Sequence, residues 1–233
     1  MGLGRSATRQ GTAFLALGRK TVVLGAFLLL PVATIARSLP PAASGATITF
    51  RKIFKSSYPE FVEIKINESG AGTYDIRQLT DDPSPQPMEV DPAVVQKIFA
   101  LAAKLHDFDG IALELHRRIA NLGQKTFQYQ LGAVTHAVTF NYTQDSTASQ
   151  LLDVFESLAR QQTDLSDLRR AMRYDRLGVN DVLLQVQKDY DRNLLIEPKK
   201  FLASLDQLAA DDHFINIARE KAHDLAARIR ASR

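Results

Sequence analysis

Histidine and carboxylate side chains stand close together at three places in the sequence, and each spacing would suit a different chemistry. The run from His106 to Asp109 (HDFD) places one imidazole and two carboxylates, those of Asp107 and Asp109, at the expected end of a helix. That set suits a metal ion or general acid–base catalysis. A histidine at a helix end also interacts favourably with the helix dipole, and Asp-rich turns are common. The run is therefore a candidate site whose alternative is an ordinary helix end.

Two further groups lie near the C-terminus. Glu220 and His223 are three residues apart, the spacing by which one helix supplies two ligands to a carboxylate-bridged di-iron site. Such a site needs two pairs of this kind and two further Glu on facing helices, whereas the sequence shows a single pair. Their charged neighbours Arg219 and Lys221 favour a solvated helix face instead. The run 211–213 (DDH) is interpreted as a turn and a helix cap, so neither a metal nor a cofactor site is predicted.

The sequence contains none of the short motifs that mark common catalytic or nucleotide sites. G-x-S-x-G, H-E-x-x-H, G-x-G-x-x-G and the Walker loop are all missing. Residues 70–72 (GAG) are expected in a hairpin turn, not between a strand and a helix, which argues against a phosphate-binding loop. Without cysteine, the chain lacks disulfides, thiolate ligands and a thiol nucleophile. No residue is therefore assigned a catalytic role, and a non-enzymatic protein is favoured.

The basic excess of the chain belongs to its N-terminal segment. Of the 29 Lys and Arg residues, five fall within residues 1–37, whereas none of the 26 Asp and Glu residues does. Residues 38–233 therefore hold 24 basic against 26 acidic side chains. Such a balance does not favour the basic surface that binds phosphate backbones, so no nucleic-acid partner is predicted.

Residues 1–37 are predicted to form a signal peptide or a membrane anchor. A basic segment precedes the uncharged apolar run of residues 21–36, and small residues follow it, which is the order of a signal peptide. The run has 16 residues, fewer than the ~20 that cross a bilayer comfortably, and Pro31 shortens the helix that it can form. Cleavage is therefore favoured over retention.

Three outcomes for this leader stay open. A cleaved signal peptide makes the mature protein periplasmic or extracellular. If the leader is uncleaved, the protein is anchored in the inner membrane through residues 21–36 alone, and residues 38–233 lie outside. The third possibility is a transit peptide, because the segment is rich in Arg and free of acidic residues.

A linker at residues 38–45 is followed by two predicted domains, residues 46–163 and residues 164–233. Alternating apolar and polar residues in the first domain predict strands, and apolar residues at helical spacing predict helices. Strands are expected over residues 48–54, 61–67, 73–79, 124–131 and 135–142, and helices over residues 91–106 and 146–162. Residues 81–87 are expected as a loop, and residues 111–122 as a short helix or an irregular connection. This order, β-β-β-α-β-β-α, predicts an α+β fold, an antiparallel sheet with helices on one face.

The second domain, residues 164–233, carries helical spacing and no strand pattern. One helix is expected from Leu165, with an interruption near Gly178, and another from Pro198. An Asp pair at residues 211–212 separates this helix from the last one, which has a narrow apolar stripe. This all-helical segment is expected to form antiparallel helix pairs that either pack on the sheet or offer a face to a partner.

Two parts of the chain resemble known families. The predicted hairpin of Val62–Asn67 and Gly70–Tyr74, together with the step Phe108-Asp109, resembles small exported bacterial domains of unknown function. These have no established site, so the resemblance implies no residue role. The stretch Phe201–Ile229 resembles one HEAT-type helical pair. A solenoid needs about three stacked repeats, so an ordinary helical hairpin is the alternative.

Two functions from different classes are compatible with these observations. The first is a non-enzymatic envelope module that binds a protein or peptide, favoured by the missing catalytic motifs and by a small sheet that can have free edges. The second is an exported hydrolase whose site involves His106, Asp107, Asp109 and His116. An enzyme should gather polar groups in one concave pocket, whereas a binding module should offer an open strand edge or an exposed apolar patch. We favour the binding module.

Overall fold

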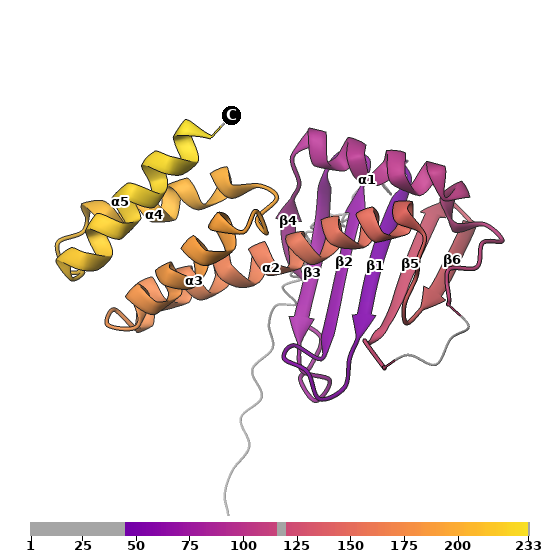
Figure 1. Ribbon diagram of the computed structural model, residues 1–233, viewed down its shortest axis with the longest axis horizontal. Helices are drawn as coiled ribbons and strands as arrows, with labels where there is room; N and C mark the ends of the chain where they lie inside the picture. The colour runs from indigo at the N-terminus through magenta and orange to yellow at the C-terminus, as the bar shows by residue number, and fades with distance from the viewer. Residues whose placement is uncertain (1–44, 116–119, 233) are drawn as a thin grey trace, which may run out of the picture. The chain divides into compact units, whose positions relative to one another are not determined.

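The computed structural model describes residues 45–115 and 120–232 (Figure 1). The predicted leader of residues 1–37 and the linker up to residue 44 lie outside these residues, as does His116. In the two described ranges, no helix combines the length and the apolar character needed to span a membrane.

Six antiparallel strands form one sheet, which confirms the predicted α+β fold. The strands are β1 (Thr47–Ile53), β2 (Phe61–Asn67), β3 (Ala71–Arg77), β4 (Gln86–Glu89), β5 (Gln124–Leu131) and β6 (Val134–Phe140), and their order across the sheet is β4-β3-β2-β1-β5-β6. The alternation in β2 is the one that the sequence predicts, with Val62, Ile64 and Ile66 buried and Lys65 exposed. The strongest hydrophobic alternation therefore belongs to the two central strands, β1 and β2.

Two helices, α1 (Pro92–Lys104) and α2 (Ser146–Tyr174), cover one face of the sheet (Figure 1). Their buried residues join those of the strands in a single core. At its centre the Phe127 ring contacts four other phenylalanines, Phe50, Phe108, Phe140 and Phe155, with ring centroids 5.3 to 6.1 Å apart. The opposite face carries polar residues, as expected for an antiparallel sheet covered on one side.

Strand β4 differs from the prediction, which placed residues 81–87 in a loop. Gln86–Glu89 pair with β3, and Pro87 lies opposite Thr73. Proline cannot donate a hydrogen bond, so it is confined within sheets to edge strands, and β4 is such an edge. The turn-forming residues of this Pro-rich stretch predict a loop, whereas pairing with β3 gives Gln86–Glu89 a strand conformation.

Helix α2 also differs from the prediction, which ended one helix near Gln162 and began another at Leu165. The structure has one helix of 29 residues. No Gly or Pro interrupts it, and the Thr163 hydroxyl donates back to the Ala159 carbonyl, so the chain offers no helix stop here. The first half of α2 packs in the sheet core, whereas its second half packs in a separate core.

The second core is built from the predicted all-helical segment. It joins the end of α2 with α3 (Val179–Asp191), the 3₁₀ turn η2 (Pro198–Phe201), α4 (Leu202–Ala210) and α5 (Asn216–Ala231). The helices pack against one another, and the α4–α5 pair accounts for the predicted antiparallel hairpin. The narrow stripe of α5 is buried at Ala218, Ala222, Leu225 and Ile229.

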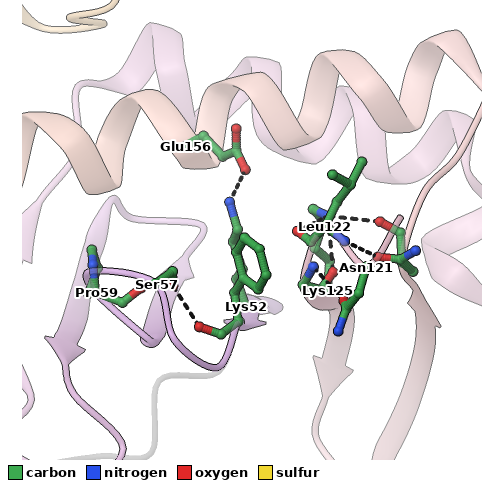
Figure 2. A network of polar contacts seen from close by, with 10 residues as sticks. Lys52, Ser57, Pro59, Asn121, Leu122, Lys125 and Glu156 are labelled. Carbon is green, nitrogen blue, oxygen red and sulfur yellow. Dashed lines mark hydrogen bonds and ion pairs between the residues drawn. The ribbon is translucent and has the colours of Figure 1, made fainter. Parts of the chain in front are cut away.

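A buried lysine holds the irregular connection that precedes β5. The Lys125 ammonium donates to the carbonyl oxygens of Leu122, Gly123 and Asn141 at 2.8 to 3.1 Å (Figure 2). Burial lowers the pKa of this ammonium, and the nearby Lys52 adds to the effect. Three carbonyl acceptors satisfy its three N–H donors, so the charge serves the structure of the connection.

Candidate functional site

The predicted run His106–Asp109 forms a strained corner directly after α1. His106, Asp107 and Phe108, which make up the 3₁₀ turn η1, have φ angles of 53°, 50° and 66°. Three successive non-glycine residues in the left-handed region are unusual and must be held by their surroundings. The Phe108 ring provides that hold, because it is buried and stacks on Phe127.

The corner brings one predicted carboxylate to a histidine that the sequence did not single out. Asp109 Oδ1 lies 4.0 Å from Nε2 of His136 in β6, and the Tyr129 ring of β5 stacks on the His136 ring. Burial raises the pKa of the Tyr129 phenol, and the carboxylate of Asp107 adds to the effect. The corner therefore lies against the outer hairpin of the sheet.

His106 does not join this group. His106 is exposed, and its imidazole makes no hydrogen bond or ion pair with any other described residue, although its backbone carbonyl accepts from the Asp109 N–H. His116 lies outside the described residues. Among the described members of the predicted set, the His106 imidazole pairs with neither aspartate, and the histidine beside Asp109 is His136.

Strand β6, next to this corner, is one of the two edges of the sheet. Its sequence, VTHAVTF, has no charged residue, no Pro and no Gly, and its seven residues pair with β5 alone among the described strands. The other edge, β4, has four residues and contains Pro87. Proteins commonly protect edge strands with charges, proline or short length, so β4 is protected in a way that β6 is not.

The hairpin register identifies the backbone groups that β6 directs outward. A two-residue turn, with Gly132 at φ 58°, joins Leu131 to its partner Val134. In such a hairpin the flanking pair is hydrogen bonded, and the pattern alternates along the strands. The N–H and C=O groups of Thr135, Ala137 and Thr139 therefore point away from β5, and all three residues are exposed.

Large apolar side chains are exposed at both ends of this edge. Leu131 and Val134 lie at the hairpin turn, and Leu122 and Tyr142 lie at the other end. An unprotected strand with apolar groups at its ends is the kind of surface to which an extended segment can be added.

The two C-terminal groups lie at the surface, with Asp211 half-buried and their other members exposed. Asp211, Asp212 and His213 offer oxygen and nitrogen atoms within 4.8 Å of one another, in the turn between α4 and α5. The backbone N–H and the ring of His213 bind the Asp211 carboxylate, and these hydrogen bonds lower the pKa of Asp211. They account for the cluster as a turn. Glu220 and His223 are exposed on α5.

Sequence comparison adds no assignment to this geometry. Neither the known protein-family models nor the curated proteins include a match to the chain. Function is therefore argued from the structure.

Proposed function

We propose that the chain is an exported, non-enzymatic module that binds an extended peptide segment of another envelope protein. The observation that carries the proposal is the unprotected β6 edge, with outward backbone groups at Thr135, Ala137 and Thr139. An added strand would pair with these groups, and its backbone hydrogen bonds would supply much of the affinity.

The chemistry of the edge also describes the segment. Because β6 has no Asp, Glu, Lys or Arg, and because Val134 and its β5 partner Leu131 are exposed at the hairpin turn, the edge suits an uncharged segment with apolar side chains. Apolar contacts at the two ends would fix the register, since alternate side chains of an added strand lie on the same face.

The exported hydrolase is the weaker candidate. It needs a base within hydrogen-bond reach of the group that it activates. His106 is exposed without a polar partner among the described residues, and His136 is 4.0 Å from Asp109, longer than a hydrogen bond.

Replacing Ala137 by proline tests strand addition. The substitution removes one outward N–H and leaves the β5–β6 hydrogen bonds in place, because proline is tolerated on an edge strand. Peptides of 12 residues, selected from a random displayed library against the full-length protein, are expected to bind the Ala137→Pro variant at least about tenfold more weakly, a loss of about 1.4 kcal/mol. Fluorescence anisotropy of labelled peptides measures the difference.

Ala137→Val is the matched control, because it keeps the N–H and has a high strand propensity. It should bind as tightly as the unmodified chain, and circular dichroism should show that both variants are folded. Equal affinity of the proline variant would refute strand addition. So would a concentration-dependent dimer that Ala137→Pro abolishes, because the edge would then pair with a second copy of the chain.

Deleting residues 1–37 tests the export part of the proposal. The shortened chain is expected to stay in the cytoplasm and to fold, because every described strand and helix begins after residue 45. Cell fractionation and circular dichroism measure the two outcomes. Secretion of the shortened chain would contradict the proposed signal, and an insoluble product would contradict the boundary at residue 37.

A further inference from the structure

A cavity of about 630 Å³ lies between α2, α3 and the loop that joins β1 to β2, well away from β6 in the sheet order. Its floor is apolar, with Phe50, Val62 and Ile76 from the strands. Tyr58 of the loop lines it too and is 91% exposed. The rest of the lining contains several charged side chains. Figure 2 shows two of them, the Lys52 ammonium and the Glu156 carboxylate, which pair at 2.7 Å.

Two buried aspartates line the cavity, one from α2 and one from α3. Asp164 of α2 is 6% exposed and Asp189 of α3 is 2% exposed. Burial, together with the nearby Asp189 carboxylate, raises the pKa of Asp164. Asp189 Oδ2 accepts a hydrogen bond of 2.8 Å from Gln185, whereas Asp164 Oδ2 is buried with no partner among the described residues.

Asp164 is also the cavity carboxylate that makes no ion pair within 4.0 Å among the described residues, although the Arg160 charge is near enough to act on it. Three other carboxylates line the cavity, and each has one: Glu156 pairs with Lys52 at 2.7 Å, Asp189 with Arg160 at 3.7 Å and Asp167 with Arg170 at 2.8 Å. A buried carboxylate without a counter-charge is costly unless it is protonated or neutralised by a ligand.

We propose that this cavity binds an alkylammonium group, with Asp164 as its counter-ion and the apolar floor as the site of its methylene chain. The ligand is either a free amine or the side chain of a lysine. The proposal goes beyond strand addition at β6 and is independent of it.

An organic cation fits this cavity better than a metal ion. Calcium and magnesium need six or more ligands, most of them oxygen. Four carboxylates line the cavity, but among the described residues the set of three metal-ligating groups within reach of one another lies in the turn at 211–213. Aromatic surface at Tyr58 and Phe54 suits a methylene chain with an ammonium end, because an aromatic face attracts a cation.

Titration of the full-length chain with 1,5-diaminopentane at pH 8, followed by calorimetry, tests the proposal. The diamine should bind. 1-Pentanol, which has a chain of the same length but no charge, should not bind. Asp164→Asn should weaken binding at least about tenfold, because the amide lacks the charge. The amide can still donate to Asp189, so the variant is expected to fold. A capped tripeptide, Gly-Lys-Gly, tests the second source, since tighter binding than the diamine would identify a lysine side chain.

Asp153→Asn is the matched control, because Asp153 is exposed on the same helix and does not line the cavity. It should bind the diamine as the unmodified chain does. Tyr58→Ala provides a second variant that cannot disturb the core, and it should weaken binding about two- to fivefold through the lost cation–aromatic contact. Equal binding by the Asp164→Asn variant, binding of pentanol as tight as that of the diamine, or no binding of either amine would overturn the proposal.

Discussion

Replacing Glu197 by alanine is expected to lower the free energy of unfolding by about 3–5 kcal/mol, the usual cost of removing one partner of a buried charged network. The Glu197 carboxylate is almost fully buried. It accepts hydrogen bonds from the backbone N–H of Asp91 and from the Gln161 amide, and it pairs with Lys200 at 3.0 Å. One side chain thus connects the start of α1, the middle of α2 and the turn η2.

Alanine at this position would leave the buried Gln161 amide and the part-buried Asp91 N–H without this acceptor, and unsatisfied donors carry most of the cost. Urea denaturation measures the loss. Glu220→Ala is the matched control, because Glu220 is exposed on α5 and its replacement should change stability by less than about 0.5 kcal/mol. Similar small losses in the two variants would mean that the network contributes little.

Stability is expected to decrease as pH rises from 5 to 8, by about 2 kcal/mol through Asp164 alone. Burial, with the adjacent Asp189 carboxylate, raises the pKa of Asp164 from 3.8 to about 7. Between about pH 4 and 7 the folded protein holds a proton that the unfolded chain has lost. The proton therefore stabilises the fold below about pH 4, and this stabilisation is lost as pH rises through 7. A pKa difference of about three units corresponds to at most about 4 kcal/mol of unfolding free energy. Screening by water in the adjoining cavity reduces this contribution.

The Asp164→Asn variant isolates this contribution, since asparagine does not titrate. The difference in unfolding free energy between the variant and the unmodified chain should grow in favour of the variant from pH 5 to 8, whereas Asp153→Asn should show no such trend. Urea denaturation at four or five pH values measures it. A constant difference between Asp164→Asn and the unmodified chain would show that Asp164 has an ordinary carboxylate titration.

The fold class could be predicted from the sequence, because apolar and polar residues that alternate along the chain indicate half-buried strands. Ile48 and Phe50 in β1, like Ile64 and Ile66 in β2, are fully buried, and the polar residues between them are not. The order of the strands was not accessible in the same way, since alternation shows which face of a strand is buried and not which strand is outermost. The exposed edge of β6 therefore emerged only from the structure.

The two carboxylates of the cavity were missed for a different reason. Aspartate in a helix ordinarily faces water, and Asp164 and Asp189 are 25 residues apart in sequence. A signal was present nevertheless. Asp164 follows Gln161 and precedes Leu168 at helical spacing, and Asp189 follows Val186 by three, so both fall on buried helix faces. A charged residue inside an apolar stripe indicates a special environment.

The length of α2 has a consequence for how the chain unfolds. Its 29 residues make a rod of about 43 Å, and both hydrophobic cores are built on it. If one core unfolds, the half of α2 that belongs to it loses the contacts that stabilise it. The other core is built on the other half of the same helix, so the two cores should unfold together. Backbone amides near Leu158 and Leu165, in the middle of the rod, should then be among the last to exchange with deuterium.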